Sequence, residues 1–412
     1  MSIIKDKSLA AAGLAKINWV KDFMPVLSCL EKKMEKEKPL KGLKVAVCVH
    51  LEAKTAYLGL VLRAAGAEIT VTGSNPLSTK DDICAALDSL GVEVFAWHGA
   101  TDQEYHDHQI KALEFCPDII IDDGSDLVAL LHDEIPQCAK NLLGGCEETT
   151  TGINRLRARS NAGKLNFPML AVNDAKCKYL FDNIHGTGQS TWDGIMYTTN
   201  NMISGRTIVI AGYGYCGMGI AMRAKGLGAN VIITEIDRHK ALAALMDGFR
   251  VMPMAEAAPL GDIFVTATGC SKVITTEHFK VMKNNVLLAN AGHFDVEVDR
   301  SALEAMSVKM ETRKPFIDGY HMADGRILNL LAEGRLVNIV AGNGHPAEIM
   351  DLSFAIQLLG VLHIAKNAKQ LKPDLYNIPQ EIDDEVAYIK LEAMKINVDV
   401  LTAEQTAYMA SM

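Results

Sequence analysis

The sequence feature that most constrains the fold is a glycine pattern in the middle of the chain. Gly212, Gly214 and Gly217 form G-x-G-x-x-G after the apolar run "TIVIAG" and before a helical pattern. The first glycine permits a tight turn, the second lets the backbone approach a pyrophosphate, and the third lets helix and strand pack closely. Glu235 ends the next apolar run, where a carboxylate accepts from a ribose diol and repels a 2′-phosphate. The pattern predicts an NAD domain; the alternative is a glycine turn without a ligand.

Strand and helix patterns alternate along most of the chain. From residue 43, apolar runs such as "KVAVCVH", "EITVTG" and "PDIIIDDG" alternate with helical stretches, and a second series begins near residue 204. This alternation indicates parallel sheets covered by helices on both faces. We therefore predict the α/β class, with two doubly wound parallel-sheet (Rossmann-like) domains and a small helical C-terminal segment. Ligands of such sheets bind beyond the carboxyl ends of the strands, where His50, Asp122 and Asp123 lie.

Composition narrows the classes of function. The chain has 412 residues, 49% of them hydrophobic, and a formal net charge of −9, which suits two or three domains and disfavours a nucleic-acid partner. No apolar run approaches the ~18 residues of a membrane span, and no signal peptide is apparent. Nine scattered cysteines without a C-x-x-C pair indicate free thiols in a reducing compartment. We expect a cytoplasmic protein without a metal, a membrane or a nucleic acid as partner.

The stretch "VAVCVHLEAKT" carries three polar side chains at steps of two. If the chain is still extended after the apolar run, His50, Glu52 and Lys54 project to one side. They then form either a salt-bridged loop or the wall of a binding site with a chosen hydrogen-bond pattern.

Several separated motifs resemble the S-adenosylhomocysteine hydrolase family. Beside the glycine turn "AGYGYCGMG", the motifs are "DDGSDL", "GCEETTTGI", "NDAKCKYLFDN", "NAGHFDVEV" and "LLAEGRLVNIVAGNGHP". The resemblance runs from about residue 43 to near the C-terminus. It implies an NAD enzyme of one-carbon metabolism that cleaves a nucleoside thioether into homocysteine and a nucleoside. In that family the ribose 3′-hydroxyl is transiently oxidised, the thiolate leaves C5′, water adds, and NAD is regenerated without leaving.

The resemblance also implies roles for individual residues. Lys178 and Asp182 attend the 3′-hydroxyl, and their spacing of four predicts one helix face. The implied catalytic residues are His50, Asp123, Glu148, Lys178, Asp182, Asn183 and His293. The implied substrate-binding residues are Glu52, Lys54, Thr55 and His345. The cofactor-binding residues are Thr149, Thr150, Thr151, Asn183, Gly212, Gly214, Gly217, Glu235, Asn290, Asn338 and His345. Taken singly, such a residue is more often a helix cap or a turn residue.

Departures from the family pattern concern the cofactor side. The usual Gly-Tyr-Gly-Asp-Val-Gly-Lys-Gly reads "GYGYCGMG", so Tyr215, Cys216 and Met218 replace Asp, Val and Lys. The family's cysteine beside the active-site Asp-Asn is Thr187 here. The chain also lacks the longer tail that covers a neighbouring protomer's NAD in many relatives.

The largest departure lies at the purine. The family's His-Met-Thr-x-Glu-Thr reads His50-Leu-Glu52-Ala-Lys54-Thr55 here, so a lysine replaces the glutamate that accepts from the 6-amino group of adenine. Lysine has three donors and no acceptor. Hypoxanthine carries an acceptor at O6 and a donor at N1–H, which suits Lys54 and Glu52. The resemblance thus implies S-inosyl-L-homocysteine as substrate, with S-adenosyl-L-homocysteine as the alternative if Glu52 and Lys54 only pair with each other.

The same resemblance suggests the domain limits. A substrate domain covers 1–183 and regains 345–374, an NAD domain covers 184–344, and 375–412 is a helical dimerisation segment of a homo-oligomer, a dimer or a tetramer. Hinges are expected near Asn183 and Gly344. Two other classes are an ordinary NAD-linked dehydrogenase and a non-catalytic NAD-binding regulator; the sugar-facing lysine and the histidines favour the hydrolase.

Overall fold

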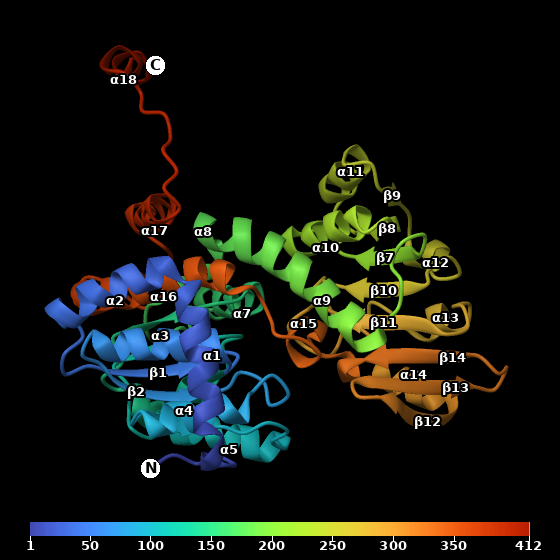
Figure 1. The fold of residues 1–412 in the computed structure, drawn as a ribbon, viewed down its shortest axis with the longest axis horizontal. Coiled ribbons are helices and arrows are strands. Elements are labelled where there is room, and N and C mark those ends of the chain that lie inside the picture. Colours follow the sequence, from blue (N-terminus) through green and yellow to red (C-terminus); the bar gives the residue numbers. More distant parts are fainter. Residues whose placement is uncertain (412) are drawn as a thin grey trace.

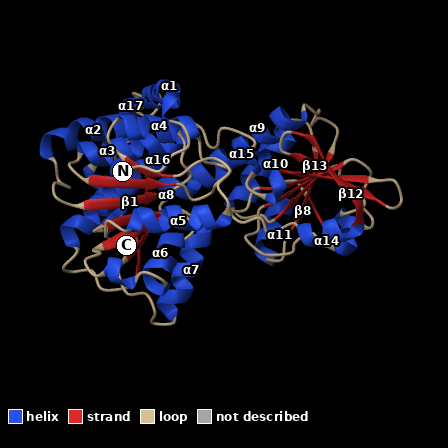
Figure 2. Cartoon of the chain, turned by 90° about the horizontal axis from the view of Figure 1, so that it is seen from below, coloured by secondary structure: helices blue, strands red, loops and turns tan. Residues whose placement is uncertain are grey.

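Two separate sheets frame the protein in the computed structural model, which describes residues 1–411. Figure 1 shows each sheet in its own lobe, with a long helix running from one lobe to the other. Figure 2, seen from below, shows helices flanking the strands of both sheets. The predicted α/β class with two Rossmann-like sheets is confirmed.

The first sheet has seven parallel strands in the spatial order β15-β6-β5-β4-β1-β2-β3. Its strands are β1 (Lys44–Cys48), β2 (Glu68–Thr72), β3 (Glu93–Phe95), β4 (Ile119–Asp122), β5 (Gly144–Glu147), β6 (Met169–Ala171) and β15 (Leu375–Asn377). Along the chain, β2 and β3 are added on one side of β1, and β4, β5, β6 and β15 are then added on the other side. The strand order therefore reverses between β1 and β4, and such a reversal opens a crevice at the carboxyl ends of the strands.

Helices cover both faces of the first sheet. They are α1 (Ala10–Asp22), α2 (Pro25–Glu37), α3 (Ala53–Ala64), α4 (Asp81–Ser89), α5 (Asp102–Leu113), α6 (Asp126–Asp133), α7 (Thr150–Asn161), α16 (Ala347–Asn367) and α17 (Gln380–Ala393). Val45 and Val47 of β1 pack into one core with α2, α3 and α16, whereas Ala46 and Cys48 pack into the opposite core with α5 and α6. Apolar residues on both faces explain why the strand reads as a continuous apolar run.

The second sheet has eight strands in the order β12-β13-β14-β11-β10-β7-β8-β9. They are β7 (Thr207–Ala211), β8 (Asn230–Thr234), β9 (Arg250–Val251), β10 (Ile263–Thr266), β11 (Val286–Asn290), β12 (Ser307–Lys314), β13 (Ile317–Met322) and β14 (Ile327–Leu331). One edge departs from the parallel arrangement of the rest of the sheet, because β12, β13 and β14 pair antiparallel. The links between these strands are too short for a crossover helix, which parallel pairing requires.

The helices of the second lobe are mostly short. They are α10 (Tyr215–Gly226), α11 (Arg238–Met246), α12 (Met254–Ala257), α13 (Thr276–Phe279), α14 (Arg300–Met306) and α15 (Val337–Val340). Here the strand order reverses between β7 and β10, directly beside the glycine turn after β7.

The chain crosses between the lobes in two different ways. The first crossing is helical throughout: α8 (Lys176–Lys178), a π-helical segment (Tyr179–Gly186) and α9 (Thr187–Thr199) follow without a break, and they form the long helix of Figure 1. The expected hinge position Asn183 therefore lies inside a helix. A π-helical turn widens a helix and is frequent at functional sites. The second crossing, 341–346, is non-helical and includes Gly344 with φ of +68°.

Helix α16 corrects one expectation from the sequence. It has 21 residues and a mean hydropathy of 1.5, so by length and composition it could cross a membrane. In the structure 72% of its apolar window is buried, and it packs against α2, α3 and β5. It is the central core helix of the first lobe.

The C-terminal region differs from the expected helical segment at its start. Residues of β15 extend the first sheet by pairing with β6, and α17 then packs against α16 and α2. The last helix, α18 (Ala403–Ala410), lies away from both lobes at the end of an extended stretch (Figure 1).

Asp351 offers a test of how α16 holds the first lobe together. This fully buried carboxylate accepts from the backbone N–H groups of Val26 and Leu27 and pairs with Lys390 at 2.9 Å. We predict that Asp351→Ala lowers the free energy of unfolding by about 3–5 kcal/mol, because it leaves two buried N–H groups without a partner and the Lys390 cation with only the Glu348 carbonyl. Glu385→Ala, which removes an exposed contact to Lys33 at 4.0 Å, should change it by less than about 1 kcal/mol. Denaturant unfolding measures both; equal effects would contradict the prediction.

Candidate active site

The polar residues predicted from separate motifs meet where the carboxyl ends of the first sheet face the second lobe. His50 follows β1, Asp123 follows β4 and Glu148 follows β5. Because these three parallel strands are adjacent, their ends lie at one edge, at the crevice between β1 and β4. His293 reaches the same place from the loop after β11.

A buried carboxylate shapes the two loops that carry Asp123 and Glu148. Glu147, at the end of β5, accepts hydrogen bonds from the Gly124 N–H, the Ser125 hydroxyl, and both the N–H and hydroxyl of Thr149. Burial raises the pKa of Glu147 well above its ordinary value. The side chain is thus a scaffold for the loops, and its neighbour Glu148 points into the site.

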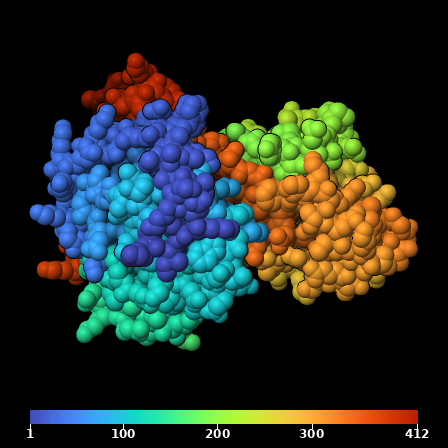
Figure 3. All heavy atoms as spheres, turned by 60° about the horizontal axis from the view of Figure 1, so that its bottom comes forward, coloured from blue at the N-terminus to red at the C-terminus, as the bar shows by residue number. Residues whose placement is uncertain are grey.

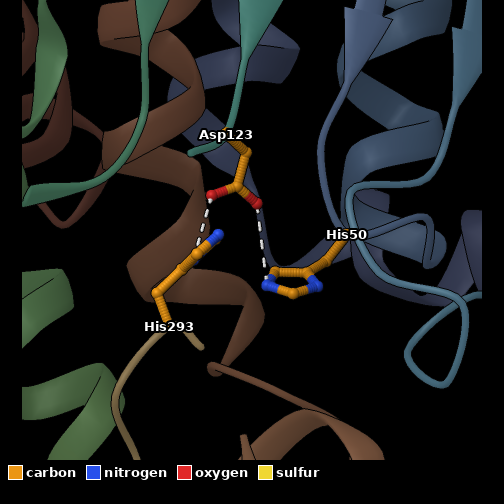
Figure 4. A group of neighbouring side chains, drawn as sticks. All are labelled: His50, Asp123 and His293. Carbon is orange, nitrogen blue, oxygen red and sulfur yellow. Dashed lines mark ion pairs between the residues drawn. The ribbon is translucent and has the colours of Figure 1, made fainter. Parts of the chain in front are cut away.

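His50, Asp123 and His293 form a compact group (Figure 4). The Nε2 atom of His50 lies 3.6 Å from one carboxylate oxygen of Asp123, and Nδ1 of His293 lies 3.8 Å from the other. Asp123 is 1% exposed, and its Oδ1 has no hydrogen-bond partner among residues 1–411. One ligand atom from each side chain lies within 4.8 Å of the others, so the group could also hold a metal ion. The prediction that this protein uses no metal is not tested by this geometry.

The hydrogen-bond network fixes how His50 presents its ring. The hydroxyl of Ser78 donates to the carbonyl of Asn75, so its oxygen accepts from Nδ1–H of His50 at 2.7 Å. Nε2 then carries the lone pair and faces Asp123. Burial lowers the pKa of His50 to about 4, although Asp123 opposes the shift. At neutral pH the ring is therefore a neutral base aimed into the site.

Lys178 is the centre of a second group. Its Nζ lies 2.8 Å from Asp182, 3.0 Å from the side-chain oxygen of Asn183, and 3.5 Å from Glu148. Lys178, Asp182 and Asn183 come from the helical crossing, whereas Glu148 comes from the sheet edge. The predicted proximity of Lys178 and Asp182 on one helix face is what the structure has.

The charges in this group perturb one another. Burial alone would lower the pKa of Lys178, but Asp182 and Glu148 raise it above its ordinary value. Burial likewise acts to raise the pKa of Asp182, but Lys178 and His345 hold it well below its usual range. Burial raises the pKa of Glu148 to about 7, with Lys178 opposing. Glu148 is therefore the member of the group that changes charge near neutral pH.

Helix α16 supplies two site residues that sequence reasoning missed. Ser353 donates to Asp182 at 2.8 Å, and Gln357 donates to Glu148 at 2.6 Å. Asn173 was also missed; it accepts from Asn183 and donates to Thr150. The available signal was a pair of polar residues four apart on an otherwise apolar helix, which places both on one face.

Glu52 and Lys54 adopt a different local structure from the one expected. The strand ends at Cys48, and Glu52 is the N-cap of α3, where its side chain accepts from the Lys54 N–H. The expectation that His50, Glu52 and Lys54 continue an extended chain is therefore wrong. Lys54 is 6% exposed; its Nζ lies 2.8 Å from Glu52 and donates to the Asn343 carbonyl in the second crossing at 3.1 Å. The salt bridge between Glu52 and Lys54, which was the alternative interpretation of the sequence, is therefore present.

Four further predicted binding residues make side-chain hydrogen bonds to other parts of the protein. The Thr55 hydroxyl donates to the His50 carbonyl, and the Thr149 hydroxyl caps α7. Asn290 is fully buried, and its amide contacts Thr266, Gly292 and Phe294 in the loop that follows, and the carbonyl of Gly334. Asn290 therefore positions the loop that carries His293. The hydroxyl of Thr150 accepts from Asn173, and Thr151 lies beside it in α7.

Asn338 and His345 line the junction between the lobes. His345 lies 3.4 Å from Asp182 through Nδ1, and its Nε2 contacts Thr187 at 3.2 Å and Asn338 at 3.4 Å. The amide oxygen of Asn338 is buried without a hydrogen-bond partner among residues 1–411. An orphaned buried acceptor of this kind is what a bound amide or hydroxyl group would satisfy.

The glycine turn has the geometry of a dinucleotide site. Gly212 has φ of +94°, a Cβ on Gly217 would lie 2.0 Å from the Gly212 carbonyl oxygen, and a Cβ on Gly214 would meet nothing within 4 Å. The turn thus needs its first and third glycines for backbone reasons, and the second opens onto free space before α10. Glu235 accepts from the N–H groups of Tyr213, Ile236 and Asp237, which fixes its carboxylate at the end of β8. These residues fit NAD.

Two of the unusual residues of this turn contact the helical crossing. Tyr215 stacks on Tyr179, with ring centroids 4.6 Å apart, and the Cys216 thiol donates to Thr187 at 3.6 Å. A thiol is therefore still present beside residue 187. It belongs to Cys216 after the glycine turn, whereas in the family pattern it belongs to residue 187 itself.

The fold and the site define a two-lobed enzyme in which a dinucleotide turn faces a buried lysine–carboxylate group. Profiles for "S-adenosyl-L-homocysteine hydrolase" and for its "NAD binding domain" match residues 2–142 and 183–344. The chain belongs to the S-adenosyl-L-homocysteine hydrolase family: it is a hydrolase of the thioether-cleaving type, and residues 183–344 are its NAD-binding domain.

Relatives with two different names match the chain about equally well. The S-inosyl-L-homocysteine hydrolase of Methanopyrus kandleri is 53% identical over 99% of this chain and 96% of its own. The adenosylhomocysteinase of Pyrococcus abyssi is 53% identical over 99% and 97%, and the S-inosyl-L-homocysteine hydrolase of Methanosarcina mazei is 52% identical over 98% and 98%. Among solved structures, phosphoglycerate oxidoreductase from Vibrio cholerae has a TM-score of 0.44 at 13% identity, over 64% of this chain and 79% of that chain.

The glycine turn yields a prediction about NAD. We expect Gly217→Ala to weaken NAD binding at least about 100-fold, because its Cβ would lie 2.0 Å from a backbone oxygen and the turn must open. Gly226→Ala, at the end of the same helix with nothing within 4 Å of the new Cβ, is the matched control. It should bind NAD normally and be slightly more stable. NAD titration of the two variants decides; equal affinities would show that the turn does not carry the cofactor.

Proposed function

We propose that this enzyme hydrolyses S-inosyl-L-homocysteine to inosine and L-homocysteine. In this proposal residues 1–183 with 345–374 hold the substrate, and 184–344 hold NAD. The observation that carries the substrate assignment is the acid–cation pair Glu52 and Lys54 at the start of α3.

The salt bridge within this pair is compatible with reading a purine edge. Of the three donors on Lys54, one serves Glu52 and one serves the Asn343 carbonyl, which leaves one. One oxygen of Glu52, Oε2, takes both contacts from Lys54, so Oε1 remains to accept. Lys54 stands where the family's acceptor faces the purine C6 substituent. A donor at that point matches O6 of hypoxanthine, and Glu52 beside it matches N1–H.

S-adenosyl-L-homocysteine is the second candidate. Two of the relatives named adenosylhomocysteinase are 53% and 54% identical to this chain, so overall identity does not choose between the substrates. The hydrogen-bond pattern does choose, because Lys54 cannot accept from a 6-amino group and a buried mismatch is strongly unfavourable.

The lysine group suits chemistry at the ribose 3′-hydroxyl. Bound NAD supplies the reversible oxidation of the 3′-carbon, so the hydroxyl must lose its proton and later regain it. Lys178 rests as a cation, since its surroundings raise its pKa, and a cation stabilises a developing 3′-alkoxide. Glu148, with a pKa of about 7 and 3.5 Å from Lys178, takes up the proton through Lys178. Asp182 and Ser353 orient the lysine.

The histidine group suits proton transfer at C4′ and C5′. Neutral His50 offers a lone pair at Nε2 beside Asp123, and a base here takes the 4′-proton while the C5′–S bond breaks and homocysteine leaves as a thiolate. When water adds at C5′, its oxygen keeps one hydrogen as the 5′-hydroxyl, the protonated base returns its proton to C4′, and the proton that water loses passes to the homocysteine thiolate. His293, from the second lobe, completes the enclosure. The net change is thioether plus water to alcohol plus thiol, with no consumption of NAD.

A homo-oligomer in the cytoplasm belongs to the same proposal. Its support is the exposure of Tyr408, Met409 and Leu401 on the segment that lies away from both lobes, since exposed apolar groups mark contact surfaces.

The substrate assignment predicts a measurable preference. We expect kcat/KM for S-inosyl-L-homocysteine to exceed that for S-adenosyl-L-homocysteine by roughly 5- to 150-fold, which corresponds to one mismatched buried polar contact. Glu52→Thr combined with Lys54→Glu should reverse the preference, whereas Lys54→Glu alone should do less because two acids would then face one purine edge. Lys80→Glu, a charge change near the pair but outside it, serves as the control. Equal kcat/KM for the two thioethers in the unmodified enzyme would refute the inosyl assignment.

Glu148 predicts a pH dependence for the first step. A proton acceptor works only when deprotonated, and burial raises the pKa of this group to about 7. The rate at which nucleoside reduces the bound NAD should therefore rise as pH increases through about 7 and then level off. In Glu148→Gln this rise should disappear and the rate should fall by about 10²- to 10⁴-fold. Stopped-flow absorbance of the reduced nicotinamide measures both; an unchanged pH profile in Glu148→Gln would assign the titration to another group.

A further inference from the structure

A cavity beside the histidine group is lined by none of the residues assigned above to the purine or to the ribose 3′-hydroxyl. It has a volume of about 150 Å³ and is lined from the first lobe by the loop Ser74–Asn75–Pro76 and by Asp102, Tyr105 and Asp126, and from the second lobe by residues 293–295 and Arg335. Figure 3 shows the boundary between the lobes on this side, where cyan residues near 100 face orange residues of the second lobe. Its size suits a small fragment, since pockets for drug-sized ligands are about 300–1,000 Å³.

Two residues that line the cavity contact Asp123, beside which the proposed function places the reacting C5′–S bond. His293 lines it and also contacts Asp123 at 3.8 Å. Ser74 lines it too, and its hydroxyl donates to Asp123 at 2.8 Å. A group leaving C5′ beside His50 and Asp123 therefore has this cavity directly before it.

Charged side chains of both signs line the cavity, and they differ in how many hydrogen bonds and ion pairs they make to the protein. Asp126 is occupied, because it accepts from Tyr105 at 3.1 Å and pairs with Arg155 at 2.9 Å. Arg335, 28% exposed, has one loose ion pair to Asp295 at 3.8 Å and no side-chain hydrogen bond within the described residues. Asp102 likewise makes no side-chain hydrogen bond or ion pair to residues 1–411. One cation on the second lobe and one carboxylate on the first lobe thus remain available to a ligand.

We propose that this cavity binds the amino-acid end of homocysteine, with Arg335 holding its carboxylate and Asp102 its ammonium group. This inference rests on the proposed function and deepens it by naming what recognises the leaving thiol. Guanidinium pairs with carboxylate in a planar, bidentate geometry, and an ammonium group needs an acceptor such as a carboxylate. Because the two residues come from different lobes, the zwitterion links them across the junction.

The reverse reaction, in which a thiol and the nucleoside join with loss of water, allows the two charges to be tested separately. Three thiols are compared: L-homocysteine, 4-mercaptobutyrate, which lacks the ammonium group, and 3-mercaptopropylamine, which lacks the carboxylate. The variants are Arg335→Gln, Arg335→Lys and Asp102→Asn, and Arg250→Gln is a control because Arg250 lies on the edge strand β9 away from the cavity. Reduction of bound NAD by inosine alone shows for each variant that the nucleoside site is intact.

The proposal predicts a crossed pattern. Arg335→Gln should lower kcat/KM for homocysteine and 4-mercaptobutyrate by about 10- to 150-fold, the effect of one lost charge-assisted contact, and leave 3-mercaptopropylamine unchanged. Asp102→Asn should do the converse, weakening homocysteine and 3-mercaptopropylamine but not 4-mercaptobutyrate. Arg335→Lys should lower kcat/KM for homocysteine less than Arg335→Gln does, and Arg250→Gln should leave kcat/KM for all three thiols unchanged.

Two results would contradict two different proposals. If Arg335→Gln and Asp102→Asn affect all three thiols equally, or none of them, while inosine still reduces the bound NAD, the subsite is wrong and the proposed function stands. If neither inosine nor adenosine reduces NAD in the unmodified enzyme, the proposed function itself is wrong.

Discussion

The burial of one lysine among carboxylates from distant parts of the chain is the interaction on which the structure of the site depends. Lys178 is 5% exposed and lies within 3.5 Å of Asp182 and Glu148. A buried charge without a partner costs several kcal/mol. Lys178 on the helical crossing must therefore stay in contact with Glu148 at the edge of the first sheet. Ser353 and Gln357 of α16 donate to Oδ2 of Asp182 and to Oε2 of Glu148. The same contacts that stabilise the group also set the protonation states that the proposed chemistry needs.

The junction between the lobes is where the remaining function is assembled. The contacts that cross it include His293 to Asp123, the Lys54 ammonium to the Asn343 carbonyl, and the guanidinium of Arg155 over the ring of Phe294 at 5.5 Å. Each joins a residue of the first lobe to a loop of the NAD lobe or to the second crossing. A change in the angle between the lobes therefore alters the surroundings of Lys54, the histidine group and the cavity together, as hinge motions do in two-lobed enzymes.

Some side chains that resemble ligand contacts are already hydrogen-bonded to the protein itself. Thr149, Thr55 and Asn290 each resemble ligand contacts in sequence, yet their side chains cap a helix or hold a loop. The glycine turn shows the converse case. Its residues Tyr215 and Cys216 depart from the family pattern, and the structure gives both a partner on the helical crossing, which ties the NAD turn to the segment that carries Lys178.

The sequence alone determined the fold class, the NAD turn and most of the residues that meet around Asp123 and around Lys178, because apolar strands, glycine spacing and literal motifs are local signals. It missed β5 and β6, which are short and, in "GGCE", rich in glycine, and it missed the antiparallel edge formed by β12 to β14. Only the tertiary structure decided that Glu52 caps a helix, that Glu148 has a pKa near 7 and that Ser353 and Gln357 belong to the site. It also decided that Arg335 and Asp102 face one cavity. The pKa of Glu148 and the meeting of Arg335 with Asp102 depend on burial and on which distant segments meet, which no local pattern encodes; a local pattern can mark Ser353 and Gln357 as one polar face but does not say what that face contacts.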